Sequence, residues 1–261
     1  MISDTAIQQF YRDGAVTIDT PLTASQLDRA VKALDRLVPE ISSTDGNKRH
    51  RAGATCSFFD PELLDIIQHS FFEAVAQQVL QTESVRFFQA AIVNSYPQPG
   101  VPFGFDQHID MQYRSADLEA VPKRIVCSFF LWLSDVTPPR APLIFRPGSH
   151  RCLAEAWEKD EDLHHEMPRV KGIKLDQLPA LDFAEPQPLL ANAGQVTVLT
   201  TGMVHGASVN LDTEPRRAFV ITFHAKGLRV GLPQQQEDTK RAYDEELRKL
   251  LRPERVHIVT D

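Results

Sequence analysis

Cysteine is scarce in this sequence, which has only three among its 261 residues, Cys56, Cys127 and Cys152. They form neither a C-x-x-C pair nor the spacing of a zinc site, so the pattern excludes a disulfide framework and a structural zinc. Cys127 lies inside an apolar run and reads as a small buried side chain. Few and unpaired cysteines are typical of reducing compartments, so we expect a cytoplasmic protein.

Long hydrophobic runs are missing as well. The longest, residues 125–133, is too short to cross a bilayer. Residues 1–5 lack the basic region and the apolar core of a signal peptide. Positive charge is in deficit, because the formal net charge is −7. We therefore expect neither nucleic acid nor a membrane as a partner.

The remaining composition is that of an ordinary globular protein, with 42% hydrophobic and 24% charged residues. A chain of 261 residues is long enough to bury one substantial core. No internal repeat or low-complexity tract divides the sequence. We expect residues 1–261 to form a single domain.

Apolar residues recur at helical spacing in the first third of the chain and again near its end. The predicted helices span residues 5–11, 25–38 (capped by Thr23 or Ser25), 61–80 and 238–251. The first three make residues 1–82 a mainly helical part, interrupted by a short strand at 14–18. The last is a charged helix that we expect on the surface or in a subunit contact, so a homo-oligomer stays open.

The second part of the chain reads as strands separated by proline and glycine turns. The expected strands are residues 85–96, 125–133, 143–145, 194–200 and 216–225. The run 125–133 is so apolar that we expect both of its faces to be covered. Short strands preceded by helices suit a mainly β fold. We predict a double-stranded β-helix (jelly roll, cupin-like) core at about 83–227, braced by the N-terminal helices.

The structure and role of two polar segments stay undecided from the sequence. Residues 151–190 are rich in charge and proline and read as an insertion that covers one mouth of the core. The adjacent His164 and His165 within it would face opposite ways on a strand, so we do not expect both to bind one ion. Residues 42–54, which contain Lys48, Arg49 and Arg51, are either a solvated loop or a lid that recognises an anionic substrate.

His108 and Asp110 form the motif on which the functional reading depends. On an extended strand, positions i and i+2 point to the same face, so the imidazole and the carboxylate project side by side. A second histidine would complete a two-histidine, one-carboxylate set that leaves positions on ferrous iron open. His205, in a predicted turn at 202–206, is the candidate. The alternative is that His205 satisfies the turn and Asp110 is a surface acid.

At this point the chain resembles the phytanoyl-CoA dioxygenase family of Fe(II)/2-oxoglutarate-dependent oxygenases, from about residue 7 to about residue 227. The resemblance rests on an ordered set of residues, namely His108-Ile109-Asp110, Pro147-Gly148-Ser149-His150, His205, Asn210 and Arg216. It implies the double-stranded β-helix fold, with His108, Asp110 and His205 as ligands of Fe(II). It also implies that 2-oxoglutarate and O2 are consumed, that succinate and CO2 leave, and that an unactivated C–H bond of a small-molecule substrate is hydroxylated.

Arg216 is the second residue of interest, because a guanidinium grips a carboxylate in a bidentate way and stays charged when buried. In the family, an arginine at this spacing after the distal histidine holds the far carboxylate of 2-oxoglutarate. Arg217 is the competitor. Strand alternation puts Arg216 on the face with smaller side chains, which leaves room for a ligand, and Arg217 on the face of Phe219, Ile221 and Phe223. We therefore choose Arg216.

Further cosubstrate contacts are expected from Gln89 and Phe129. Phe129 stands where relatives often place an aromatic residue, and Gln89 belongs to the preceding strand. Each has an alternative reading, as core for Phe129 and as a solvent-facing residue for Gln89. His150 is expected to fix its turn. Gln107 stands where many relatives carry an aromatic residue, which leaves the substrate-side wall open.

Asp110 also bears on the type of reaction. Related halogenases replace this acid with a small residue, so a carboxylate favours hydroxylation or a related oxidation such as desaturation. Two other functions remain: a catalytically silent relative that binds a metabolite, and a cupin-like metalloenzyme that does not use 2-oxoglutarate. The intact ligand set argues against the first and Arg216 against the second. The sequence does not identify the substrate, nor whether it is free, CoA-linked or carrier-bound.

Overall fold

A computed structural model of the chain describes residues 2–38, 51–52, 58–159 and 168–260, with the backbone alone described at 51–52. Lys48 and Arg49, and likewise His164 and His165, lie outside the described residues, so the expectations about them stay predictions. Among the helices that the structure describes, none is long and apolar enough to cross a membrane.

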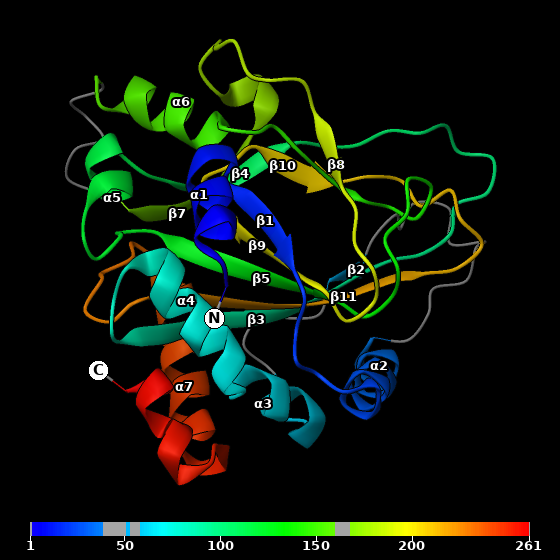
Figure 1. The fold of residues 1–261 in the computed structure, drawn as a ribbon, viewed down its shortest axis with the longest axis vertical. Helices are drawn as coiled ribbons and strands as arrows, with labels where there is room; N and C mark the ends of the chain where they lie inside the picture. Colours follow the sequence, from blue (N-terminus) through cyan, green and yellow to red (C-terminus); the bar gives the residue numbers. More distant parts are fainter. Residues whose placement is uncertain (1, 39–50, 53–57, 160–167, 261) are drawn as a thin grey trace.

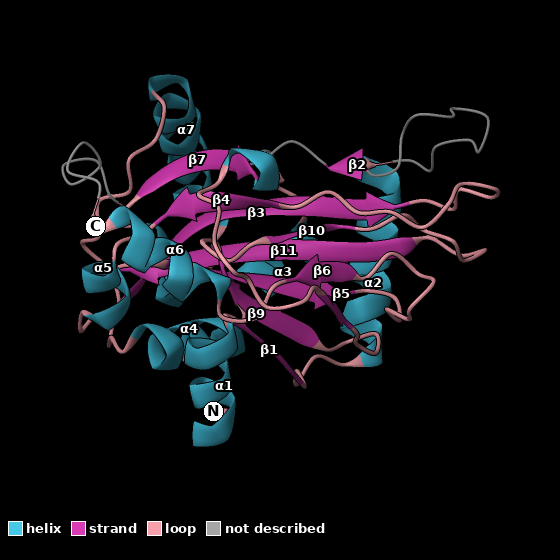
Figure 2. Cartoon of the chain, turned by 90° about the horizontal axis from the view of Figure 1, so that it is seen from above, coloured by secondary structure: helices cyan, strands magenta, loops and turns pink. Residues whose placement is uncertain are grey.

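The described strands form two antiparallel sheets that face each other (Figure 1). The larger sheet has, in spatial order, β1 (Ala15–Ile18), β9 (Val196–Thr200), β5 (Val126–Trp132), β11 (Arg216–Ala225), β3 (Val85–Ser95) and β2 (Arg51–Ala52). The smaller sheet has β7 (Arg169–Lys174), β4 (His108–Gln112), β10 (His205–Ala207), β6 (Leu143–Phe145) and β8 (Gln187–Leu189). Strands of the smaller sheet lie over those of the larger one when the molecule is viewed from above (Figure 2). The expected mainly β fold is confirmed.

Helices cover the outer faces of this pair of sheets. The α-helices are α1 (Asp4–Asp13), α2 (Ala24–Leu37), α3 (Pro61–Ile67), α4 (Ser70–Leu80), α5 (Ser115–Glu119), α6 (Ser149–Trp157) and α7 (Gln234–Leu250). Short 3-10 helices follow at η2 (Leu175–Gln177) and η3 (Pro253–Val259). In Figure 1, α3, α4 and α7 lie below the larger sheet and α6 lies above the smaller one. The expected bracing by N-terminal helices is present, and the N-terminal part also adds β1 to one edge of the larger sheet.

The apolar strand β5 shows how the larger sheet is held in place. Phe129 packs edge-on against Phe72 of α4, with ring centroids 5.9 Å apart. The next residue, Phe130, points to the other face and lines the cavity between the sheets. Both faces of β5 are therefore covered, as the unbroken apolar run predicts.

Local sequence signals explain where the first helices begin and end. Thr23, one of the two expected caps, forms a capping box with Gln26 at the start of α2. Gly14 ends α1 with φ +88°. A Cβ at Gly14 would lie 2.8 Å from Nδ1 of His150, so only glycine permits this close contact between α1 and α6. The predicted helix at 61–80 is in fact two helices, α3 and α4, separated by Gln68 and His69.

Residues 151–190 differ from the expectation of a covering insertion. They contain most of α6 and supply β7 and β8, the two edge strands of the smaller sheet. The sequence concealed these strands because lysine and proline are common at sheet edges, where they discourage further pairing, and both occur here.

Candidate metal centre

One cross-strand pair brings the two candidate histidines together. His205 begins β10, where a turn was expected, and is paired in register with His108 of β4. Their ring centroids are 4.8 Å apart. Asp110 lies two residues further along β4, with its carboxylate oxygens 3.4 Å from Nε2 of His108 and 3.6 Å from Nε2 of His205. One ligand atom from each residue therefore lies within 4.8 Å of the other two.

The electrostatics of this group suit a cation. Hydrogen bonding to Asp110 raises the pKa of His108, whereas burial lowers the pKa of His205. Burial opposes ionisation of Asp110, yet the hydrogen bond with His108 and the charges of the two imidazoles outweigh it and lower the pKa of Asp110. An ionised Asp110 and a neutral His205 have the protonation state that metal binding requires, and a metal ion would displace any proton held between His108 and Asp110.

A backbone carbonyl on the Nδ1 side of the ring fixes the orientation of His205. Its Nδ1 lies 2.8 Å from the carbonyl oxygen of Met203, so Nδ1–H donates and the Nε2 lone pair faces Asp110. Val204 is held on both sides, because its N–H donates to Ser149 Oγ at 2.9 Å and its carbonyl accepts from Arg146 N at 2.9 Å. The turn around Ser149 therefore positions the second histidine. His150 is buried beside this turn, with Nε2 3.3 Å from the carbonyl oxygen of Tyr11.

Asp110 is braced through Thr201. The Thr201 carbonyl accepts from the backbone N–H groups of Asp110 at 3.0 Å and Met111 at 3.2 Å. The Thr201 hydroxyl lies 2.6 Å from the Tyr113 hydroxyl, which also accepts from Val126 N at 2.9 Å. Tyr113 thus connects the β4 segment that carries Asp110 to the larger sheet.

Arg216 is fully buried and lines the same cavity as the three candidate ligands. Its Nη2 donates to Ser95 Oγ at 2.7 Å, and its Cζ lies 5.4 Å from the ring centre of Trp132. Nε and Nη1 find no hydrogen-bond partner among the described residues. Burial lowers the pKa of Arg216 to about 10, so the group stays charged at neutral pH. A buried cation with two unpaired nitrogens, Nε and Nη1, is costly unless a carboxylate accepts their N–H bonds.

Arg217 faces the opposite way, as strand alternation predicts. Its guanidinium donates to the carboxylate of Asp35 on α2, at 2.7 and 3.1 Å. Asn210, which the resemblance includes, is buried and donates to the carbonyl oxygens of Ser95 and Glu214, both at 2.9 Å. It therefore shapes the chain just before Arg216.

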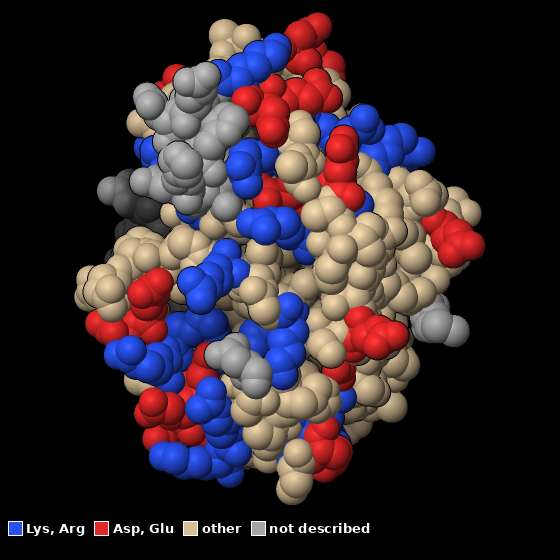
Figure 3. Space-filling model, turned by 90° about the vertical axis from the view of Figure 1, so that its left-hand side faces the viewer, with Lys and Arg blue, Asp and Glu red and all other residues tan. Residues whose placement is uncertain are grey.

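The cavity between the sheets has a volume of about 870 Å³, within the range of roughly 300–1,000 Å³ usual for small-molecule sites. On the side that presents β7 and α7, the molecular surface is hollowed and bordered by lysine and arginine side chains (Figure 3). Apart from the candidate ligands and Arg216, the wall includes Phe88, Gln89, Ala91, Val93, Ser128, Phe130, Leu143, Val170, Gly172, Val220 and Thr222.

The expectation for Phe129 is wrong. Its side chain faces the helices rather than the cavity, between Phe72 and Phe223, whose ring centroids are 5.9 and 5.8 Å away. Its neighbours Ser128 and Phe130 line the cavity instead, because successive strand residues point to opposite faces. Gln107 also lies outside the wall, and its Oε1 accepts from Arg146 Nε at 2.9 Å.

The C-terminal helix contributes wall residues that sequence reasoning missed. As expected, α7 lies on the surface with most of its residues exposed, and in addition Gln235, Gln236, Thr239 and Lys240 line the cavity. The segment before α7 is tied to β7 by a hydrogen bond from Val170 N to the carbonyl oxygen of Gly231, 2.9 Å long. No local pattern in the sequence signals this contribution, since it depends on where α7 packs.

Comparison with known proteins places this geometry in context. The model of the phytanoyl-CoA dioxygenase (PhyH) family matches residues 10–218. The chain belongs to the PhyH family. A search of curated proteins finds no match.

Solved structures share the fold at low identity. The epimerase SnoN, in complex with Fe3+, alpha ketoglutarate and nogalamycin RO, is 19% identical, with 85% of this chain and 83% of that chain covered and a TM-score of 0.64. The alpha ketoglutarate dependent carbocyclase SnoK is 17% identical, with 91% of this chain and 90% of that chain covered and a TM-score of 0.65. HygX from Streptomyces hygroscopicus, with nickel, 2-oxoglutarate and hygromycin B bound, is 12% identical, with 87% of this chain and 88% of that chain covered and a TM-score of 0.59.

The residues of this PhyH-family chain fit both an iron ion and 2-oxoglutarate. Two imidazoles and one carboxylate are a ligand set for ferrous iron that leaves other positions open. The buried guanidinium of Arg216, with Nε and Nη1 unpaired, fits one carboxylate of a dicarboxylate such as 2-oxoglutarate.

Proposed function

We propose that this protein is an Fe(II)- and 2-oxoglutarate-dependent dioxygenase that hydroxylates an unactivated C–H bond of a small organic substrate and releases succinate and CO2. The observation that carries this proposal is that one cavity contains both the His108, Asp110 and His205 group and the incompletely paired guanidinium of Arg216. Family membership supports it. The organic molecules bound in the structures of SnoN and HygX support a small-molecule substrate.

In this proposal, His108, Asp110 and His205 hold the iron. When bound, Fe(II) and 2-oxoglutarate supply the oxidising chemistry with O2, and the protein supplies placement. His205 presents Nε2 because Met203 accepts its Nδ1–H. Arg216 grips the far carboxylate of the cosubstrate, and its bond to Ser95 fixes the plane of the fork.

The remaining wall residues orient the substrate and exclude water. Apolar side chains such as Phe88, Phe130 and Val220 present a dry surface to its hydrocarbon part. The carboxylate of Asp110 favours hydroxylation over halogenation, because it occupies the position that a halide would need. Two facing antiparallel sheets support assignment of residues 1–261 to one domain with a double-stranded β-helix core.

The test is turnover of 2-oxoglutarate by the purified protein with Fe(II) and O2. We expect succinate to form slowly without substrate and faster with a productive one, whose product gains one oxygen atom. Asp110→Ala should abolish both activities. If iron binds but succinate is absent across a broad substrate panel, the metabolite-binding alternative is favoured instead.

A further inference from the structure

The two ends of the cavity carry different polar groups. Arg216 marks one end. Gln89 lies towards the other, because it pairs with Thr222, six positions further along β11. At about 3.3 Å per residue, this separation is about 20 Å between Cα atoms. A five-carbon dicarboxylate held by Arg216 is much shorter, so Gln89 is poorly placed to contact it.

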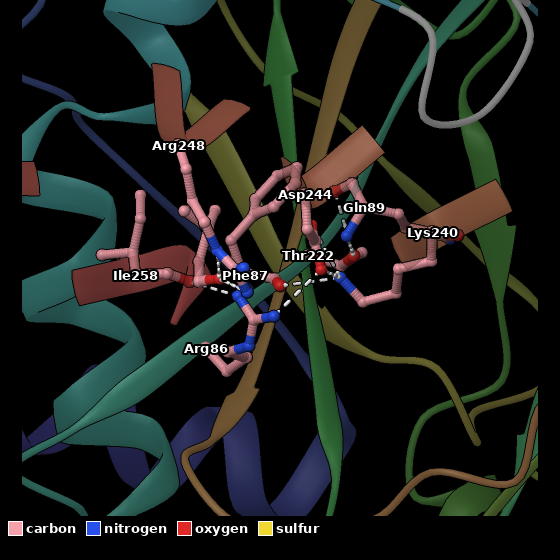
Figure 4. Close-up of polar contacts among 9 residues, drawn as sticks. Arg86, Phe87, Gln89, Thr222, Lys240, Asp244, Arg248 and Ile258 are labelled. Atoms are coloured by element: carbon pink, nitrogen blue, oxygen red, sulfur yellow. Dashed lines mark hydrogen bonds and ion pairs between the residues drawn. The ribbon is translucent and has the colours of Figure 1, made fainter. Parts of the chain in front are cut away.

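Three glutamines line the part of the cavity that lies away from Arg216. Gln89 of β3 and Gln235 and Gln236 of α7 all line the cavity. The backbone N–H and carbonyl of Gln89 are bonded to Thr222 Oγ1, at 3.0 and 3.1 Å, which leaves its side chain to the cavity (Figure 4). Within the described part of the chain, the side-chain amides of these three glutamines form no hydrogen bond; Gln89 is half-buried, and Gln235 and Gln236 are exposed to solvent.

The charged groups at this end are already engaged with one another. Lys240 Nζ donates to both carboxylate oxygens of Asp244, at 3.1 and 2.8 Å. Asp244 also accepts from Nη2 of Arg86 on β3 at 2.9 Å, and this buried group attaches α7 to the larger sheet (Figure 4). The attachment sets the position of the α7 backbone that carries Gln235 and Gln236.

Charge on the outer surface acts differently from the wall. The lysine and arginine side chains around the hollow face solvent (Figure 3), where salt screens them over about 8 Å at physiological ionic strength. They influence how a ligand approaches. At the α7 end the wall presents the amides of Gln235 and Gln236, the hydroxyl of Thr239, and Lys240, whose ammonium group is bonded to Asp244.

We propose, on the basis of the function assigned above, that Gln89, Gln235 and Gln236 recognise an uncharged, hydroxyl-rich group of the substrate. A carboxamide both donates and accepts, as a hydroxyl does, so the two match where a fixed charge would not. The apolar body of the substrate then lies against Phe88 and Phe130. An analogue that lacks hydroxyls leaves the half-buried amide of Gln89 unpaired, so the site should bind that analogue more weakly.

The test uses three probes with a common phenyl group: phenyl β-D-glucoside, phenyl β-D-glucuronide and 2-phenoxytetrahydropyran. Each is titrated by calorimetry into protein loaded with Fe(II) and 2-oxoglutarate without oxygen, and again into metal-free protein. We expect the glucoside to bind about tenfold or more tightly than either of the others. Gln89→Met, and separately the double variant Gln235→Met/Gln236→Met, should weaken it about five- to tenfold.

A matched control is available on the same helix. Gln234 bonds to Asp238 at 3.3 Å and does not line the cavity, so Gln234→Met should leave glucoside binding unchanged. The affinity for 2-oxoglutarate should stay within about twofold in all these variants, since hydrogen bonds worth several-fold are lost only on the substrate side.

Several results would overturn the proposal: no measurable glucoside binding, a glucuronide or tetrahydropyran that binds as tightly, or glutamine variants that bind like the wild type. If Gln89→Met weakens 2-oxoglutarate instead, Gln89 belongs to the cosubstrate site. Failure of wild-type protein to bind 2-oxoglutarate would count against the proposed function, and the titrations of metal-free protein would still report on the glutamines.

Discussion

The two sheets hold their functional residues in different ways. In the larger sheet, β11 pairs with β3 along its whole length and with β5 over Ala218–His224, and Arg216 is one residue of this long ladder. In the smaller sheet, β10 meets β4 at a single residue pair, His205 with His108. Because this ladder is so short, hydrogen bonds of the Ser149 and Tyr113 side chains also hold the segments that carry His205 and Asp110. The larger sheet is therefore the scaffold, and the geometry of the metal centre depends on individual hydrogen bonds.

The largest effect on stability is expected on the helix face of the larger sheet. Phe129→Ala leaves a cavity between β5 and α4 and should lower the free energy of unfolding by about 3–5 kcal/mol in urea titrations. Phe103→Ala, at a residue that is 50% exposed, is the matched control and should change it by less than about 1 kcal/mol. A small effect of Phe129→Ala would mean that this face is not the main core.

Protonation of His150 tests the joint between α1 and α6. Burial lowers the pKa of His150 to about 4, below the ordinary value of 6.5. Between these values the unfolded chain binds the proton and the folded one does not, so stability is lost as pH falls from 6.5 towards 4. The loss from this residue reaches about 3 kcal/mol. Urea titrations of metal-free protein across this range should show a shallower pH dependence in His150→Gln, and an equal slope would contradict the account.

Tyr113→Phe distinguishes the two sheets directly. Removing the hydroxyl leaves Val126 N without its acceptor and Thr201 Oγ1 with only the Val126 carbonyl, so we expect a loss of about 1–3 kcal/mol together with weaker Fe(II) binding. Tyr96, whose hydroxyl donates to the Val38 carbonyl at 3.1 Å, is the control. Tyr96→Phe should lower stability to a similar degree and leave Fe(II) affinity unchanged. Equal effects of both variants on Fe(II) binding would contradict a specific role of Tyr113 in positioning the metal centre.

The smallest effect is expected at Arg217. Its ion pair with Asp35 is partly exposed, and such pairs contribute about 0–1 kcal/mol. Arg217→Met should therefore change the urea midpoint only slightly and leave 2-oxoglutarate affinity as it is. A marked loss of cosubstrate binding in this variant would show that the choice between the two arginines was wrong.

Residue alternation along strands made much of the site predictable. It placed His108 and Asp110 on one face and separated Arg216 from Arg217, and both placements agree with the structure. The same rule was insufficient for Phe129. Since β5 is apolar on both faces, nothing local shows which face meets the cavity.

Other features arise only from tertiary packing. The edge strands β7 and β8 carry lysine and proline and lack a clear apolar alternation, so the sequence did not reveal them. The wall contributed by α7 depends on the contacts of Asp244 with Arg86 and Lys240, of which the first joins residues far apart in the chain. Its glutamines are exposed residues, and only the placement of the helix against β3 brings Gln235 and Gln236 to the cavity wall.

The most direct measurement is titration of 2-oxoglutarate into Fe(II)-loaded protein without oxygen, for the wild type and for Arg216→Met. Loss of a charged, bidentate contact should weaken binding by about 100-fold, while the bound iron remains at one equivalent. Wild-type affinity in Arg216→Met, or loss of iron along with the cosubstrate, would contradict the assignment of one cavity to a metal centre and a separate carboxylate grip.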